Sequence, residues 1–377
     1  MPDLRPPVVA TAVRCPAHLP ATSAATTAPP RGSSADGVFP ARPTDHGVIA
    51  VLQIGFIGTG GIAQRHIRNL QQLGRARVVA FCDIAADKAE QAARAHGATA
   101  YTDFTRMLEA ERLDAVFLCT PPFVRAEPIL AVAARGLALF CEKPPAFDAA
   151  QGRRALAAIG AAGVTSNVGF MYRWLQIVAK AKELMAGRKL AALRSAFLCG
   201  PAVEMNLPAW FYLKDRSGGP LMDQAIHVLD LHRYLAGEVA TVHALANNQI
   251  RPKTEAFTIE DTYTLNLAYD SGVIASHTHS WACAPALAQI ELISAAARLT
   301  IDLFANRLTG TVDGVEITYA PRDDCYLTEV DNFLTAVERH DPGRLRSPYA
   351  DALNTCAVTW AGLRSVETGR VEVPERL

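Results

Sequence analysis

A glycine-rich segment constrains the fold of this chain more than any other feature. Residues 55–67 read GFIGTGGIAQRHI and directly continue an apolar run, IAVLQI. Gly58, Gly60 and Ala63 match the pattern G-x-G-x-x-A. In this pattern the first glycine permits a tight turn, the second lets the backbone approach a pyrophosphate, and the third small residue lets the helix pack closely on the strand. We therefore predict a buried strand, a glycine turn and a helix from Ile62 to Leu73 that open a dinucleotide-binding domain.

The sequence that follows alternates apolar strands with amphipathic helices. The predicted strands are ARVVAFCD, DAVFLCT and ALFCEKP, and the predicted helices are AADKAEQAARAHG, about 104–109 and about 127–135. Near-continuous apolar strands separated by helices are typical of a parallel sheet covered on both faces. We predict an α/β Rossmann domain with a doubly wound parallel sheet over residues 49–168.

The pattern changes after about Thr165. A helix (175–186), the strand LAALRSAFLCG and a second helix (221–235) precede the strands TVHALANNQ, TYTLNLAYD, GVIASHTHSW, AQIELISAA and ARLTIDLF. AYDSG between two of these strands is a hairpin signal. Two helices, 329–339 and 349–367, end the chain. We predict an α+β substrate-binding domain over residues 169–377 with a large open mixed or antiparallel sheet, and its last helix is a candidate to pack back on the Rossmann domain.

The first 48 residues differ in composition from the rest of the chain. They hold 9 of the 23 prolines, are rich in Ala, Thr and Ser, and show neither helical nor strand periodicity. We predict a disordered leader, because too little apolar surface is present to offset the entropy of ordering. A transit peptide, or translation that begins near Val48 or Val51, remains an alternative. A secretory signal is disfavoured because no continuous apolar core is present.

Charge and cysteine content exclude several classes of partner. Lys plus Arg (37) balances Asp plus Glu (37), so the chain has no overall basic field that would recruit nucleic acid or an anionic membrane. The eight cysteines are scattered without a C-x-x-C pair, which favours small buried side chains in a reducing compartment, and we expect a cytoplasmic protein. His277 and His279 share one face of a strand, but no third ligand has convincing spacing, so we predict sheet packing and no metal site.

Four further side chains would carry the chemistry. Asp83 ends the second strand 20 residues beyond Ala63, where an acid binds the adenosine ribose hydroxyls and repels a 2′-phosphate. This favours NAD over NADP, although a turn-forming or helix-capping aspartate is the alternative. Lys143 ends the strand ALFCEKP, at the sheet edge where α/β proteins bind ligands. Asp223 and His227 lie four residues apart on one helix face, so Asp223 would orient His227, a group suited to acid and base catalysis.

These segments resemble the Gfo/Idh/MocA oxidoreductase family, which includes glucose-fructose oxidoreductase and inositol dehydrogenases. The matching pieces are GFIGTGGIA, CTPP, CEKP, GFMYRW, SGGPLMDQAIH and the C-terminal sequence from FLTAVERH onward. The resemblance implies an enzyme acting on CH–OH groups, with Lys143, Asp223 and His227 beside the nicotinamide. It also implies a contact from Glu142 to the nicotinamide ribose, a cis peptide before Pro144, and a homodimer or homotetramer formed through the C-terminal sheet.

The predicted binding residues fall into two sets. The predicted cofactor contacts are Gly58, Thr59, Gly60, Gly61, Ile62, Asp83, Thr120, Pro121, Glu142 and Lys143. The predicted substrate contacts are Arg173, Trp174, Trp210, Tyr212, Asp223 and His227, because aromatic faces suit a sugar ring and polar groups suit its hydroxyls.

Two departures from the family pattern concern the substrate. Arg125 stands where the family often has a histidine, so it would recognise a different group, and Gln224 and Ala225 replace the usual small residues of the D-x-G-x-H segment. The leading hypothesis is an NAD-dependent dehydrogenase or reductase of a sugar, inositol or related polyol. The alternatives are NAD-assisted glycoside cleavage by transient oxidation and elimination, and a non-catalytic NAD-bound sensor or regulator.

Overall fold

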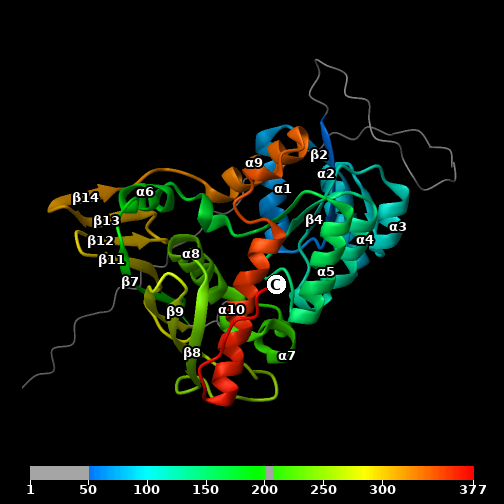
Figure 1. The fold of residues 1–377 in the computed structure, drawn as a ribbon. Coiled ribbons are helices and arrows are strands. Elements are labelled where there is room, and N and C mark those ends of the chain that lie inside the picture. The colour runs from blue at the N-terminus through cyan, green and yellow to red at the C-terminus, as the bar shows by residue number, and fades with distance from the viewer. Residues whose placement is uncertain (1–50, 201–206) are drawn as a thin grey trace, which may run out of the picture. The chain divides into compact units, whose positions relative to one another are not determined.

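The computed structural model describes residues 51–200 and 207–377. The predicted leader, residues 1–48, lies outside these residues. In the described part of the chain, 52–168 form a six-stranded sheet in the order β3-β2-β1-β4-β5-β6 (Figure 1). Its strands are β1 (Leu52–Ile57), β2 (Ala76–Cys82), β3 (Thr99–Tyr101), β4 (Ala115–Leu118), β5 (Ala138–Cys141) and β6 (Ser166–Val168). Its helices are α1 (Gly61–Leu73), α2 (Ala86–His96), α3 (Phe104–Ala110), α4 (Ala126–Ala134) and α5 (Ala149–Ala162).

Every pairing in this sheet is parallel, so the carboxyl ends of its strands share one edge. β2 pairs with one side of β1 and β4 with the other, which makes the end of β1 the point where the strand order reverses. Ligands of doubly wound sheets bind at such a point. The predicted Rossmann architecture is confirmed. The sequence analysis left out α5, whose segment AAQGRRALAAIGAA has few large apolar side chains, and the short strands β3 and β6.

The remaining strands form a second sheet, eight-stranded in the described residues, in the order β14-β13-β12-β11-β7-β10-β9-β8. They are β7 (Leu190–Leu198), β8 (Val239–Asn247), β9 (Thr262–Tyr269), β10 (Ile274–Ser280), β11 (Leu287–Ser294), β12 (Ala297–Asp302), β13 (Arg307–Val312) and β14 (Val315–Tyr319). β10 runs parallel to β7 and all other pairs are antiparallel, which confirms the predicted mixed sheet. The edge strand β14 and its neighbour β13 were not predicted.

Helices α6 (Gln176–Met185) and α8 (Ile226–Ala236) pack on one face of this sheet and share its main apolar core. Alternation places Tyr263, Leu265 and Leu267 of β9 in that core. The opposite face is open: Leu245 of β8 and Ile274 of β10 are each 62% exposed. The segment predicted as one helix from Leu221 to Leu235 begins instead with a π-helical turn, η5 (Leu221–Ala225), before α8.

The last two helices connect the second half of the chain with the Rossmann sheet. α9 (Cys325–Arg339) packs beside α1 (Figure 1). Asp324, which caps α9, also pairs with Arg65 of α1. α10 (Tyr349–Thr368) contacts the segment after β5, because Tyr349 Oη donates to Pro145 O (3.2 Å) and Trp360 Nε1 donates to Phe147 O (2.9 Å). The C-terminal helix thus packs against the residues that follow Lys143. α9 begins four residues earlier than predicted, because Asp324 provides a cap that the sequence analysis overlooked.

Candidate active site

The glycine loop after β1 is crowded beside Gly58 and leaves space for a ligand beside Gly60. Gly58 has a φ of +90°, and a Cβ built on it would lie 2.7 Å from the carbonyl oxygen of Cys119, which follows β4. A Cβ on Gly60 would meet no atom within 4 Å. α1 begins at Gly61 and has no side-chain cap, so its first backbone N–H groups are available to an anion. These residues fit the pyrophosphate of a dinucleotide.

Asp83 follows β2 and holds the glycine loop. Its Oδ2 accepts hydrogen bonds from the backbone N (3.0 Å) and Oγ1 (2.8 Å) of Thr59, while its Oδ1 accepts from the backbone N of Ala85 (3.0 Å). The turn-forming role considered as the alternative is therefore present as well. Because a carboxylate has about four acceptor positions, Asp83 retains capacity for ribose hydroxyls. The next side chain, Ile84, is 96% exposed and offers no positive charge to a 2′-phosphate.

Arg125 corrects an expectation from the sequence, because its side chain binds the protein's own backbone. It is 4% exposed, its Nε donates to Thr120 O (2.9 Å), and its Nη1 donates to the carbonyl oxygens of Glu142 and Pro144. Arg125 thus joins the Thr120–Pro121 loop after β4 to the segment after β5. It is not available to recognise a substrate group.

Glu142 is buried, and its carboxylate contacts the backbone of Lys143. Its Oε1 lies 2.7 Å from His66 Nε2 on α1, and its Oε2 accepts from the backbone N of Lys143 at 3.1 Å. Burial alone would raise the pKa of Glu142, but the hydrogen bond from His66 and the charges of His66, Lys143 and Arg125 outweigh it and leave the pKa below its ordinary value. Glu142 is therefore an ionised group that fixes the end of β5. No pattern in the sequence had suggested His66 as its partner.

Lys143 and Asp223 meet across the two halves of the chain. Lys143 Nζ donates to Asp223 Oδ1 (3.0 Å) and to the Asp223 carbonyl oxygen (2.7 Å), and the two side chains are 18% and 16% exposed. The Lys143–Pro144 peptide is cis, as the family resemblance implied. An ammonium group has three donors, so two bonds to Asp223 leave one for a ligand oxygen.

His227 lies on α8 with only 7% of its surface exposed, against the rings of Phe170 (6.1 Å) and Tyr172 (5.4 Å). Its pKa lies well below 6.5, because burial disfavours the charged imidazolium and the charge of Lys143 adds to that effect. The imidazole is therefore neutral and able to accept a proton near pH 7.

The expected orientation of His227 by Asp223 is not found: in the described residues Asp223 accepts no hydrogen bond from His227, and His227 Nδ1 has no partner there. The reason is the π-helical turn at Leu221–Ala225, which widens the first turn and breaks the spacing of an α-helix. Asp223 consequently orients Lys143, not His227.

Two predicted substrate residues prove to be structural. Arg173, 3% exposed, pairs with both carboxylate oxygens of Asp230 (2.7 and 2.6 Å) and with Asp351 (2.6 Å). Trp174 is 6% exposed, and the guanidinium of Arg346 lies 4.2 Å from its ring centre. Both residues of the GFMYRW motif therefore belong to the core. The ion pairs of Arg173 with Asp230 and Asp351 explain why a charged residue occupies this buried position.

Trp210 and Tyr212 lie together in η4 (Ala209–Tyr212). Trp210 stacks on Phe211 (4.0 Å) and meets the edge of Phe123 (6.0 Å), which belongs to η1 (Pro122–Val124) after β4. Tyr212 packs near Phe257 (5.9 Å) in a small satellite cluster with Trp281. Trp210 thus remains a candidate substrate wall next to the predicted cofactor contacts Thr120 and Pro121, whereas Tyr212 packs on Phe257.

Three residues around Gln224 and His227, namely Cys199, Trp281 and Tyr172, were not predicted to belong to the site. Gln224 Oε1 accepts from Trp281 Nε1 (2.5 Å) and from Cys199 Sγ (2.9 Å), and Tyr172 packs on His227. Cys199 and Trp281 follow β7 and β10, so these contacts depend on sheet pairing. Only Tyr172, within the quoted GFMYRW motif, had a sequence signal near it.

The remaining predicted structural groups lie away from this cluster. His277 Nδ1 bonds Ser195 Oγ (2.8 Å), and both His277 and His279 are fully buried under α8.

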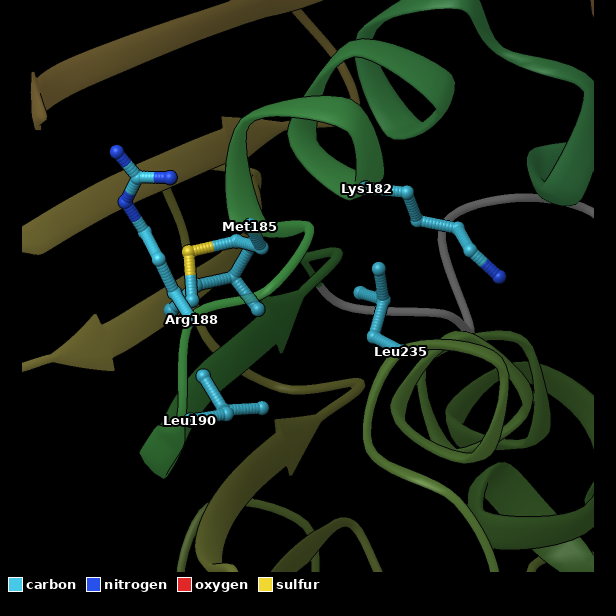
Figure 2. Close-up of a pocket in the computed structure, with 6 residues that line it drawn as sticks. Lys182, Met185, Arg188, Leu190 and Leu235 are labelled. Carbon is cyan, nitrogen blue, oxygen red and sulfur yellow. The ribbon is translucent and has the colours of Figure 1, made fainter.

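A separate cavity of about 130 Å³ lies between α6, β7, α8 and β11, lined by Lys182, Met185, Arg188, Leu190, Leu235 and Leu292 (Figure 2). None of these six residues belongs to the predicted site. In the described chain, no helix is long and apolar enough to cross a membrane, and no three His, Cys, Asp or Glu side chains are grouped to hold a metal.

Comparison with known proteins identifies both halves. Residues 52–170 match the sequence model described as "Oxidoreductase family, NAD-binding Rossmann fold", and 178–300 match the "GFO/IDH/MocA C-terminal domain". D-apiose dehydrogenase of Paraburkholderia graminis is 32% identical over 58% of this chain and 57% of its own length. Inositol 2-dehydrogenase of Rhizobium meliloti is 32% identical over 50% and 56%. The alignments thus span less than two thirds of these relatives.

A solved structure of levoglucosan dehydrogenase in complex with NADH superposes with a TM-score of 0.80 at 20% identity, covering 86% of this chain and 100% of that chain, which establishes the common fold. The two family matches together cover more than half of the chain, and they confirm the NAD-binding domain that Gly58, Gly60 and Asp83 predicted. The chain therefore belongs to the GFO/IDH/MocA family of NAD-binding oxidoreductases.

Proposed function

We propose that the protein is an NAD-dependent oxidoreductase that transfers a hydride between the nicotinamide and a secondary alcohol or ketone of a sugar, an inositol or a related polyol. The substrate class is supported by the names of the two relatives, which refer to apiose and inositol. The observation that carries the proposal is the contact of Lys143 Nζ with Asp223 at 2.7 and 3.0 Å, close to the neutral imidazole of His227.

In the oxidative direction, His227 accepts the proton of the substrate hydroxyl. Its depressed pKa keeps the imidazole in the accepting form, and its low exposure limits competition from water. The third N–H of Lys143 donates to the same substrate oxygen and stabilises the alkoxide charge that develops there. Asp223 holds the ammonium in place and balances its charge. When bound, the cofactor accepts or returns the hydride, and Gly58, Thr59, Gly60 and Asp83 are the residues that would hold it.

The test is a panel of polyols and aldoses, including myo-inositol and D-apiose, followed by NADH absorbance with wild type, Lys143→Ala and the control Lys189→Ala. Lys189 is exposed and lies between α6 and β7. Removing Lys143 should lower kcat/KM by about 10²- to 10³-fold, the usual contribution of one donor that stabilises a developing negative charge on oxygen. NADH affinity should stay within about threefold, because the glycine loop and Asp83, which would hold the pyrophosphate and the adenosine ribose, are unchanged in this variant.

Unchanged turnover in Lys143→Ala would refute the mechanism. Release of an aglycone from a glycoside panel without net NADH would instead support cleavage by transient oxidation. Binding of NADH with no turnover of any compound would favour a sensor.

We also propose that a second copy of the chain covers the open face of the C-terminal sheet. A hollow of about 570 Å³ on this face is lined by residues of β7 to β11, and polar side chains such as Arg194, His243 and Asn266 lie among the apolar ones. Two of its apolar residues, Ile274 and Val371, are 62% and 61% exposed. Exposed apolar patches of this kind are characteristic of interfaces. Sedimentation equilibrium should give a dimer or tetramer for wild type and a smaller species for Ile274→Glu. A monomeric wild-type protein would contradict the proposal.

A further inference from the structure

Gln224 occupies an exceptional place in the buried segment that carries the catalytic groups. From Ser217 to Arg233 every residue is buried except Asp223 and Gln224. Asp223 holds Lys143 through its carboxylate and its carbonyl oxygen. Asp223 and Gln224 are therefore the two partly exposed residues of this segment, and Gln224 is the immediate neighbour of the residue that positions the lysine.

The orientation of the Gln224 amide is determined by its partners. An indole N–H can only donate, so the 2.5 Å contact to Trp281 Nε1 requires the amide oxygen, not the nitrogen, on that side. Cys199 Sγ, 2.9 Å from the same oxygen, is also a donor. The pKa of Cys199 is raised to about 12 by burial and by the charge of Asp223, so the thiol keeps its proton. Two donors thus converge on Oε1.

This arrangement turns the amide nitrogen away from Trp281 and Cys199 with both of its N–H groups unused. Gln224 Nε2 donates to no atom of the described residues, and it is not one of the buried unpaired atoms. Trp281 is 2% exposed and packs with Phe257 and Ile259, so the group that holds the amide is itself rigid. A preorganised donor next to the Lys143–Asp223 pair is what recognition of a second substrate oxygen requires.

We propose that Gln224 is a specificity-determining residue that donates a hydrogen bond to a second oxygen of the substrate, a hydroxyl or ring ether beside the alcohol that reacts. The assignment rests on the proposed function, because it deepens the substrate class of the same site. Trp281 is a positioning residue that acts through Gln224. Ligands with two neighbouring oxygens bind well, and an analogue that lacks the second oxygen leaves the amide unpaired.

Gln224→Glu tests the proposal most sharply, because a carboxylate still accepts from Trp281 and Cys199 but has no N–H to give the substrate. Gln224→Leu removes the donors without adding charge, and Gln249→Glu on the exposed segment after β8 controls for the charge change. Each variant is assayed with the best polyol of the panel and with the deoxy analogue that lacks the hydroxyl next to the reacting carbon. Thermal unfolding and NADH titration of each variant establish that the fold and the cofactor site are intact.

We expect Gln224→Glu and Gln224→Leu to lower kcat/KM for the polyol by about 10- to 100-fold, mainly through KM, because the bond is made in both ground and transition states. For the deoxy analogue the same variants should differ from wild type by less than about threefold, since the lost partner is already missing. Trp281→Phe should raise KM for the polyol less than either Gln224 variant does. In this variant the Gln224 amide remains but loses the hydrogen bond from the Trp281 indole that orients it.

Two results would overturn the inference: equal losses for polyol and deoxy analogue, or unchanged KM in both Gln224 variants. Failure of the proposed function is a distinct outcome, since the wild type would then turn over no member of the panel.

Discussion

The loop after β1 and the turn before α8 both carry predicted site residues, but they are assembled in different ways. The loop contacts Asp83, which follows the adjacent strand, and its geometry depends on backbone: a positive φ at Gly58 and open space at Gly60. The turn before α8 depends on side chains from distant segments, namely Lys143 after β5, Cys199 after β7 and Trp281 after β10. Backbone requirements restrict residue type locally and are visible in a motif, whereas side-chain partners come from tertiary structure.

The largest expected effect tests whether Arg173 belongs to the tertiary framework of the substrate half. Arg173→Ala leaves Asp230, 1% exposed, without its partner, and should lower the free energy of unfolding by about 3–5 kcal/mol. Chemical denaturation measures the loss, and KM of the folded fraction should not change. The exposed pair Arg153–Glu375 is the control, since Arg153→Ala should cost less than about 1 kcal/mol. A raised KM with unchanged stability would instead indicate that Arg173 contacts the substrate, and it would contradict the assignment of Arg173 to the tertiary framework.

The second prediction separates the two glycines of the cofactor loop. Gly58→Ala combines a φ of +90° with a contact of 2.7 Å to Cys119 O, and should lower the free energy of unfolding by about 1–3 kcal/mol. Gly60→Ala has a φ of −66° and no neighbour within 4 Å, so its stability should match wild type. NADH affinity of Gly60→Ala should nevertheless fall by about tenfold or more, equal to about 1.4 kcal/mol, because the methyl group enters the space left for the ligand. Equal stability of the two variants would contradict this assignment.

The third prediction uses pH to distinguish the halves. Burial lowers the pKa of His232 and His277 to about 3, and it lowers the pKa of His227 and His279 well below 6.5; all four lie in the substrate half. Below pH 6.5 these four histidines bind protons in the unfolded chain, whereas in the folded protein they stay neutral until the pH approaches their lowered pKa values. Stability is therefore complete above pH 6.5 and falls as the pH is lowered toward the folded pKa values.

Each such histidine contributes a slope of about 1.4 kcal/mol per pH unit in that window. His279→Leu removes a ring whose two nitrogens are buried and unpaired, so the slope between pH 6 and pH 5 should decrease by about that amount. Denaturation curves at pH 8, 6 and 5 measure it, with pH 8 as the reference at which protonation plays no part. Hydrogen exchange should show the C-terminal sheet losing protection before the Rossmann sheet. An unchanged slope in the variant would count against the assignment of His279.

Most of the fold was predictable because it is encoded in local periodicity. The apolar runs of β1, β2, β4 and β5 and the glycines after β1 indicated a doubly wound sheet, and the alternation in β8 to β12 indicated the second sheet. The omitted elements carry weak local signals: α5 is rich in alanine, and β13 and β14 are short strands with few large apolar side chains. The strand order of the second sheet, in which β7 lies between β10 and β11, depends on pairings distant in sequence.

The errors at the site have a common cause. Arg173 and Trp174 were placed at the substrate because their residue types suit a sugar, but burial and an ion pair to Asp230 decide their role. Asp223 was paired with His227 on the assumption of α-helical spacing, which a π-helical turn breaks. Arg125 binds backbone carbonyls that its own motif does not contain.

The sequence by itself determined the cofactor loop, the acid at Asp83, the two-sheet architecture and the residue types Lys143, Asp223 and His227, because each follows from a backbone requirement or a motif contained in one segment. Only the tertiary structure decided that Asp223 holds Lys143, that His227 is buried and neutral, and that Trp281 turns the amide of Gln224. These properties depend on which groups from distant segments exclude water from one another, and burial and pairing of that kind arise only when the strands and helices have packed.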